Sequence, residues 1–142
     1  MRRIISGSSQ GPKLPGKAII AIVDDDHSVR DALTSLVRSL GYVAMPLECA
    51  EDLLNSKHRR SVAYVIADLH MPGTTGLELH DRLVASGEPI PTILITAFPD
   101  EKSRERALKA GVIGYLTKPF SEDDLLACIR STLGRCEPGG TG

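Results

Sequence analysis

The fold of this chain is indicated most clearly by residues 64–76, Tyr-Val-Ile-Ala-Asp-Leu-His-Met-Pro-Gly-Thr-Thr-Gly. The apolar, largely β-branched run at 62–67 is too short for a helix and is followed by Pro72 and Gly73, which is typical of a central strand in a parallel sheet. Asp68 comes directly after that run, and open α/β sheets bind their ligands at the carboxyl ends of strands. An isolated Asp before Pro-Gly more often only caps a turn. Whether Asp68 has a function or only caps a turn therefore depends on which residues stand at the ends of the other strands.

Outward from this stretch, the chain alternates strand and helix five times. The apolar runs predict strands at residues 18–23, 42–47, 62–67, 91–96 and 112–117, and the periodic segments predict helices at 28–40, 50–57, 75–84, 100–110 and 121–133. Ser28 before Asp31 and Thr75 before Glu78 have the spacing of helix-capping boxes. Short connections between these elements predict a doubly wound, five-stranded parallel sheet with helices on both faces, a three-layer α/β/α fold.

Length and composition limit the function classes. The 142 residues suffice for one domain, which we expect at 18–134, between a basic, flexible tail at 1–17 and a flexible tail at 135–142. A net charge of -1 gives no reason to expect direct nucleic-acid binding. No apolar segment is long enough to span a membrane, and three cysteines without metal-type spacing suggest a reducing compartment. These features predict a cytoplasmic protein.

Polar side chains stand at the carboxyl ends of four predicted strands. They are Asp24, Asp25, Asp26, Asp68, Thr96 and Lys118. Carboxylates gathered at one edge repel one another unless a cation lies between them, and Mg²⁺ prefers such hard oxygen ligands. A lysine and a hydroxyl nearby can neutralise and hydrogen-bond a phosphoryl group in transfer. The set predicts phosphoryl transfer to Asp68 as the nucleophile, with Asp26 the weakest ligand candidate.

The same residues carry a family resemblance. The motifs are Val23-Asp24-Asp25-Asp26, Asp68 with Met71-Pro72-Gly73 and Gly76, Ile95-Thr96-Ala97, Gly114-Tyr115, and Lys118-Pro119-Phe120. With these motifs in this order, the chain from Ala18 to Leu133 resembles the receiver domain of bacterial two-component response regulators. The resemblance implies a flavodoxin-like sheet with strand order 2-1-3-4-5 and a cis peptide bond before Pro119.

The resemblance also assigns roles at the site. It implies that Asp24 and Asp25 hold Mg²⁺ together with Asp68 and the backbone carbonyl of His70. It implies that Asp68 accepts a phosphoryl group from a sensor histidine kinase. Thr96 and Lys118 would contact that group, and Thr96 and Tyr115 would form the switch.

By the same resemblance, the protein is a regulator and not an enzyme, catalysing only its own phosphorylation and dephosphorylation. The charge-rich helix at 100–110 has few apolar residues to bury. We expect this helix, the strand at 112–117 and the last helix to form the surface that switches. That surface would bind a downstream target or effector domain, or a second copy in a homodimer. No output domain follows Leu133, so we expect either a stand-alone regulator or one that is continued by an effector.

Two further expectations concern bulky and titratable side chains. Phe98 and His70 stand two positions beyond Thr96 and Asp68, where the family places residues that govern water access to the acyl phosphate. Their bulk predicts slow self-dephosphorylation. We expect His27, His58 and His80 at the surface, without catalytic roles.

Two alternatives stay open. Asp24-Asp25-Asp26-His27-Ser28 can be matched to the nucleophile loop of haloacid-dehalogenase-like Mg²⁺-dependent phosphatases, with Asp24 as nucleophile, Lys118 as their lysine and Asp123-Asp124 as their closing acids. That match leaves Asp68 unexplained and puts the closing acids at a helix start. The other alternative is a receiver-shaped binding module that works without phosphate.

Overall fold

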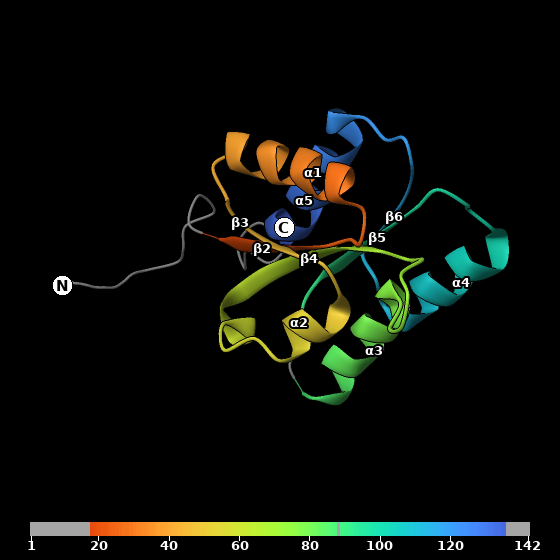
Figure 1. Ribbon diagram of the computed structural model, residues 1–142. Coiled ribbons are helices and arrows are strands. Elements are labelled where there is room, and N and C mark those ends of the chain that lie inside the picture. The colour runs from red at the N-terminus through yellow and green to blue at the C-terminus, as the bar shows by residue number, and fades with distance from the viewer. Residues whose placement is uncertain (1–17, 88, 136–142) are drawn as a thin grey trace.

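The computed structural model describes residues 18–87 and 89–135 (Figure 1). The strands are β2 (Ile19–Val23), β3 (Val43–Leu47), β4 (Val62–Asp68), β5 (Thr92–Thr96) and β6 (Gly114–Thr117). The helices are α1 (His27–Ser39), α2 (Ala50–Leu54), α3 (Gly76–Ala85), α4 (Glu101–Ala110) and α5 (Glu122–Arg135), with a 3-10 turn, η2 (Arg59–Ser61), before β4. The predicted tails lie outside the described residues, except that α5 continues through Arg135.

The five strands form one parallel sheet in the order β3-β2-β4-β5-β6. This is order 2-1-3-4-5 along the chain, so the predicted doubly wound topology is confirmed. Val23 pairs with Ala67, Asp68 with Ile95, and Thr96 with Thr117. Because neighbouring strands end at nearly the same level, the residues that follow them meet at one edge.

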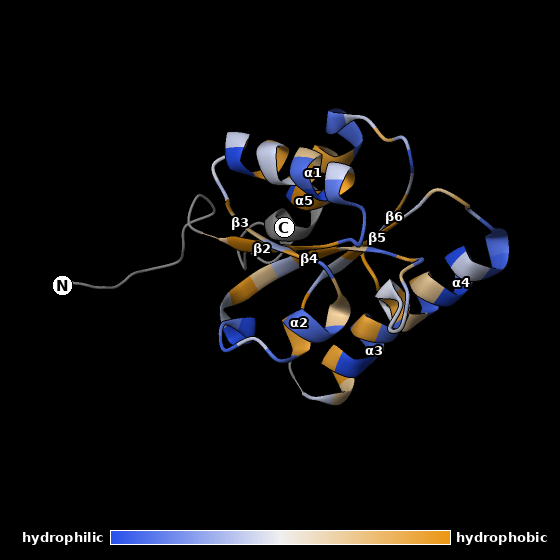
Figure 2. Cartoon of the chain, in the orientation of Figure 1, coloured by the Kyte–Doolittle hydropathy of each residue, from blue (hydrophilic) through white to orange (hydrophobic). Residues whose placement is uncertain are grey.

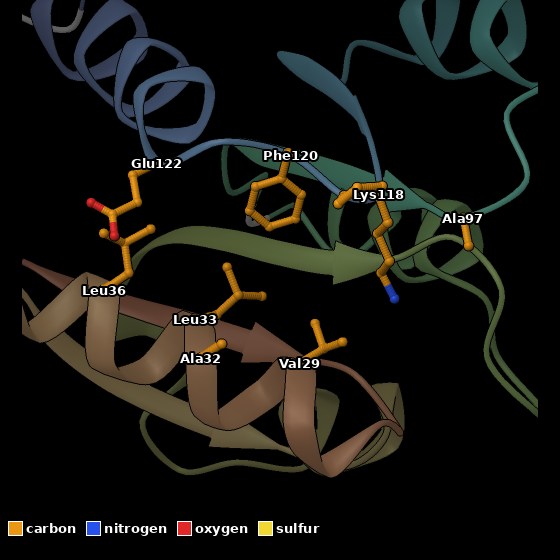
Figure 3. A pocket seen from close by; sticks show the side chains of 9 residues that line it. Val29, Ala32, Leu33, Leu36, Ala97, Lys118, Phe120 and Glu122 are labelled. Atoms are coloured by element: carbon orange, nitrogen blue, oxygen red, sulfur yellow. The ribbon is translucent and has the colours of Figure 1, made fainter.

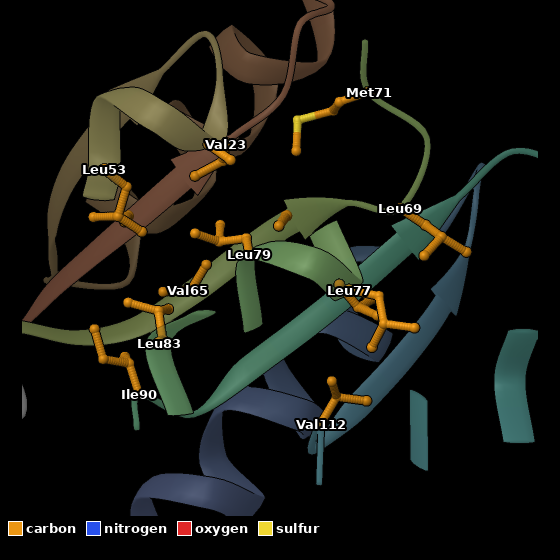
Figure 4. Packing of buried hydrophobic residues seen from close by; sticks show 14 of the residues in the cluster. Val23, Leu53, Val65, Leu69, Met71, Leu77, Leu79, Leu83, Ile90 and Val112 are labelled. Carbon is orange, nitrogen blue, oxygen red and sulfur yellow. The ribbon is translucent and has the colours of Figure 1, made fainter. Parts of the chain in front are cut away.

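Helices cover both faces of the sheet, which confirms the three-layer architecture. Figure 1 shows α1 and α5 on one side and α2, α3 and α4 on the other. Side chains alternate along each strand, so that Ile20 and Ile22 pack with α1 and α5, whereas Ala21 and Val23 pack with α2 and α3. In Figure 2 the strands form an apolar middle layer, and Figure 4 shows the cluster beneath α2 and α3 that includes Val23, Leu53 and Leu79.

Two helix starts are instructive. Thr75 and Glu78 form the predicted capping box of α3. The predicted cap of α1 at Ser28 is wrong, because Asp26 is the cap and accepts the backbone N–H groups of Ser28 at 2.9 Å and Val29 at 3.3 Å. Asp26 is thus engaged by the helix start, as expected for a helix-leading acid.

Several boundaries differ from the prediction by a few residues. α2 ends at Leu54 instead of residue 57, and β6 begins at Gly114 instead of residue 112. The chain turns before β6 because Gly111 ends α4 in the left-handed region, with φ 103°. Within the described part of the chain, no helix has the length and apolarity needed to cross a membrane.

One side chain is placed differently from the prediction. His80 on α3 is 4% exposed, so the expectation of a surface histidine is wrong there. Leu77 and Leu83, three positions before and after it, are also buried. This spacing puts His80 on the apolar face of the helix, and its Nδ1 has no hydrogen-bond partner among the described residues.

Candidate functional site

The four polar strand ends come together at the carboxyl edge of the sheet. Asp24 follows β2, Asp68 ends β4, Thr96 ends β5 and Lys118 follows β6. The Lys118 ammonium donates to Asp68 Oδ2 at 2.9 Å and to Asp24 Oδ2 at 3.3 Å. The Lys118 ammonium therefore joins the Asp24 and Asp68 carboxylates, which are 44 residues apart in the chain (68 − 24) and almost completely buried.

Local backbone groups fix both carboxylates. Asp68 Oδ1 accepts the backbone N–H of His70 at 2.9 Å, and Asp24 Oδ1 accepts that of Asp26 at 2.9 Å. Arg30 donates to the backbone carbonyl of Asp24 at 2.7 Å. The Lys118–Pro119 peptide bond is cis, as the family resemblance implied. Each carboxylate keeps its other oxygen for Lys118, so the acids are oriented before any ligand binds.

Three acids lie close enough to share a cation. One carboxylate oxygen from each of Asp24, Asp25 and Asp68 lies within 4.8 Å of the other two. Two of these side chains are buried and Asp25 is exposed, which leaves the cluster open to solvent on one side. Oxygen-only donors with no nearby thiolate or imidazole nitrogen in the cluster suit Mg²⁺ and not zinc. The residues present therefore fit the cofactor that the sequence predicts.

Burial and charge shift the proton affinities at this site. Burial raises the pKa of Asp24 above its ordinary value, and the neighbouring Asp68 charge raises it further, against the opposing effects of the Asp26 N–H and Lys118. Burial alone would lower the pKa of Lys118, but hydrogen bonds and charges from Asp68 and Asp24 outweigh it and leave that pKa raised. Lys118 is therefore fully protonated at neutral pH.

A cavity of about 340 Å³ opens onto the acids. Its lining comprises Asp25, Asp26, Asp68, His70, Ala97, Phe98 and Lys118. The His70 and Phe98 rings meet edge to face with centroids 6.1 Å apart, although Phe98 is 74% exposed. The rings thus stand beside the entrance to Asp68.

The two predicted switch residues lie behind this cavity and not in its lining. Thr96 is fully buried, and its hydroxyl oxygen accepts the backbone N–H of Phe98 at 3.0 Å. Tyr115 is half-buried, and its buried hydroxyl has no hydrogen-bond partner among the described residues. It lines a smaller cavity with the first turn of α4, which includes Glu101 and Arg104. Thr96 thus ends the strand next to Asp68, and Tyr115 lies beside the first turn of α4.

An apolar groove of about 560 Å³ adjoins the site at Lys118 (Figure 3). Its lining comprises Val29, Ala32, Leu33, Leu36, Ala97, Lys118, Pro119, Phe120 and Glu122. Figure 3 shows the α1 side chains facing Phe120, on the segment after β6. The groove thus runs from Lys118, at the carboxyl edge of the sheet, along α1.

The phosphatase alternative has little support in this geometry. Asp123 and Asp124 lie in the first turn of α5 and are exposed, and Asp124 accepts the backbone N–H of Ser121 at its helix start. Neither joins the acid cluster found among the described residues. Asp68, which that alternative leaves without a role, is the carboxylate nearest to Lys118.

The sequence alone did not predict the Arg30 contact, the Thr74–Glu51 hydrogen bond or the burial of His80. Arg30, which holds the Asp24 carbonyl, lies four positions beyond the α1 cap, where it can reach back over the first turn. The hydrogen bond from Thr74 to Glu51 joins residues with no local pattern. The burial of His80 could have been predicted, because the spacing of its apolar neighbours in α3 is helical.

Comparisons with known proteins agree with this arrangement. The response regulator receiver domain family matches residues 20–130. The response regulator protein TmoT of Ectopseudomonas mendocina is 41% identical over 117 residues, which cover 82% of this chain and 53% of that protein. The solved response regulator StyR is 40% identical, with a TM-score of 0.74 over 81% of this chain and 58% of that one. The BeF3-activated DrrB receiver domain is 28% identical, with a TM-score of 0.74 over 82% of this chain and 97% of its own.

The chain spans about half the length of the curated relatives it matches, 53% for TmoT. The matched part is the receiver domain, and in this chain the acids, the lysine and the threonine stand at the strand ends described above. With the family matched over residues 20–130 and the fold matched over four fifths of the chain, this protein belongs to the receiver domain family of two-component response regulators.

Proposed function

We propose that Asp68 accepts a phosphoryl group from a sensor histidine kinase, with Mg²⁺ held by Asp24, Asp25, Asp68 and the backbone carbonyl of His70. The observation that carries this proposal is the Lys118 ammonium, 2.9 Å from Asp68 Oδ2 at the wall of an open cavity. A carboxylate that lines an open cavity beside a cation can act as a nucleophile. The cytoplasm, where kinases have ATP, is the corresponding location.

Phosphoryl transfer to Asp68 forms one bond to phosphorus and breaks another. A carboxylate oxygen of Asp68 attacks phosphorus, the bond from phosphorus to the donor's imidazole nitrogen breaks, and that nitrogen keeps the electron pair. Mg²⁺, when bound, neutralises charge on the phosphoryl oxygens. Lys118 lies where it can stay paired with the phosphorylated side chain, and the Thr96 hydroxyl can donate to a phosphoryl oxygen. The product is an aspartyl phosphate on Asp68.

The switch follows from the placement of Thr96, Tyr115 and α4. A phosphoryl group adds acceptor oxygens beside Thr96, and we propose that the threonine hydroxyl turns toward them. Space behind Thr96 then admits Tyr115, whose hydroxyl has no partner among the described residues. Movement of Tyr115 changes the surface formed by α4, β6 and α5. That surface would bind a downstream target or effector domain, or a second copy of the chain.

The kinase must approach Asp68 from its solvent side. The groove between α1 and Phe120 adjoins Lys118 there and offers an apolar surface. We propose that this groove contacts the kinase during transfer, since small apolar residues such as Ala32 allow close approach. Small-molecule donors would not need the groove.

Phe98 and His70 are proposed to slow the loss of the phosphoryl group. Hydrolysis requires a water molecule in line with the phosphorus–oxygen bond, and both rings line the cavity through which water reaches Asp68. Bulk at the entrance reduces the probability of that approach. The phosphorylated state should therefore be long-lived.

The direct test is incubation with acetyl phosphate and Mg²⁺, followed by mass measurement of the intact protein. The wild type should gain one phosphoryl group, and Asp68→Asn should gain none. A phosphoryl group on Asp68→Asn that disappears in Asp24→Asn would favour the phosphatase alternative. No gain by the wild type, from acetyl phosphate or from a kinase, would favour a binding module that works without phosphate.

A further inference from the structure

The loop after Asp68 is tied to a helix that has no other part in the site. Thr74 is 5% exposed, and its hydroxyl donates to Glu51 Oε2 in the first turn of α2. A buried hydroxyl left unpaired would be costly, so this bond is a constraint on the loop. The bond is charge-assisted, and it is the main reason why the pKa of Glu51 lies below its ordinary value.

The loop has firm anchors at both ends. At its start, the N–H of Leu69 donates to the carbonyl of Ile95 at 2.8 Å, and Met71 is 6% exposed. At its end, Gly76 lies so close to the Asp68 carbonyl that an added Cβ would be 2.6 Å from that oxygen. Between these anchors, the Thr74 hydroxyl reaches across to α2. The loop therefore has little freedom while that bond persists.

α2 is itself anchored close to the acids. Ala50 and Leu53 are fully buried in the same cluster as Val23 and Met71 (Figure 4). Just before α2, the carbonyl of Leu47 accepts the N–H of Asp24 at 3.2 Å. Glu51 is thus held in a fixed relation to Asp24 on one side and to the loop on the other.

We infer that Thr74 and Glu51 are positioning residues for Mg²⁺ binding, because their hydrogen bond fixes the loop that carries His70, whose backbone carbonyl is the proposed fourth ligand. This inference rests on the proposed function. Neither residue belongs to the acid cluster that would hold the cation. They limit how far the loop can drift from the acids, so that the oxygen ligands are in place before the cation arrives.

The test is direct Mg²⁺ titration by isothermal calorimetry, without any phosphoryl donor. Partners that hydrogen-bond a metal ligand contribute about 10–100-fold to affinity. Thr74 acts through the intervening backbone, so we expect Thr74→Val to weaken Mg²⁺ binding by less, about three- to tenfold. Thr74→Ser keeps the hydroxyl and should bind within about twofold of the wild type. Glu51→Ala should match Thr74→Val, and the double variant should be no weaker than either single variant.

The outcomes separate this inference from the proposed function. Unchanged Mg²⁺ affinity in folded Thr74→Val and Glu51→Ala would overturn the positioning role while leaving the proposed function intact. Additive losses in the double variant would also overturn it, because the residues would then act separately. No Mg²⁺ binding by the wild type would overturn the proposed function and this inference together. Urea unfolding of each variant verifies that the protein titrated is folded.

Discussion

Gly76 offers the sharpest test of how tightly the site is built. An added Cβ at this position would lie 2.6 Å from the Asp68 carbonyl oxygen and 2.8 Å from Leu94 Cδ2. Ordinary contacts begin near 3.4 Å, so the Asp68 carbonyl would have to move by about 0.8 Å (3.4 − 2.6). That oxygen belongs to the backbone of Asp68, the proposed phosphoacceptor. Gly76→Ala should therefore disturb both stability and the site.

The magnitude follows from two opposing effects. Overpacking of this kind costs about 1–3 kcal/mol. Alanine in a helix offsets up to about 1 kcal/mol of that loss, and less at the first residue of α3. We expect a net loss of about 1–2 kcal/mol in the free energy of unfolding. With urea m-values of about 1–3 kcal/mol/M, the unfolding midpoint should fall by about 1 M.

Gly73→Ala is the matched control in the same loop. Gly73 has φ 78° and open space around its Cα, so alanine there costs about 1–2 kcal/mol through backbone conformation without pressing on Asp68. Both variants should lose stability, but only Gly76→Ala should also weaken Mg²⁺ binding and slow phosphorylation by acetyl phosphate. A Gly76→Ala protein with wild-type stability and wild-type Mg²⁺ affinity would refute the reasoning.

Three other predictions concern the surroundings of the site. Phe98→Ala should shorten the lifetime of the phosphorylated protein and change the unfolding free energy by less than about 0.5 kcal/mol, because the ring is largely exposed; an unchanged lifetime would remove its proposed role. Ala32→Arg should slow transfer from a phosphorylated histidine kinase that is active on the wild type, but not from acetyl phosphate; equal slowing of both would argue against groove contact. Burial lowers the pKa of His80 below its ordinary 6.5. As the pH falls, the unfolded chain therefore takes up a proton at this histidine before the folded protein does. The free energy of unfolding should consequently fall as the pH drops below 6.5 toward the pKa of the folded protein. In urea unfolding, His80→Gln should reduce this pH dependence relative to the wild type. The same pH dependence in both proteins would contradict the role of His80.

Much of the fold could be predicted because its signals are local. Continuous apolar runs closed by Gly or Pro mark the buried parallel strands, and the Thr75–Glu78 spacing marks the start of α3. The site could be predicted from topology alone, since parallel strands bring Asp24, Asp68 and Lys118 to one edge whatever the details of packing.

The helix cap at Asp26 and the Thr74–Glu51 hydrogen bond could not be predicted, because they depend on contacts that no local sequence pattern encodes. Asp26 and Ser28 are both good caps, and the choice of Asp26 follows from where the Asp24 carboxylate accepts its N–H. Glu51 and Thr74 are 23 residues apart, and their bond exists because α2 and the loop after Asp68 pack on the same face of the sheet. Side-chain hydrogen bonds of this kind are decided by tertiary packing.

The two helices that flank β5 in the chain differ in how firmly they are packed. α3 and α4 each have ten residues, yet α3 buries five of them and α4 buries only Ala107, leaving Leu108 45% exposed. A buried leucine contributes about 1.5–3 kcal/mol and a methyl group less than about 1. Moving α3 would thus cost several kcal/mol and would pull on the loop after Asp68, whereas moving α4 would cost less because it buries less apolar surface. If Asp68 is phosphorylated as proposed, we expect α4 to shift and α3 to stay in place, so that a distant surface changes while the site keeps its geometry.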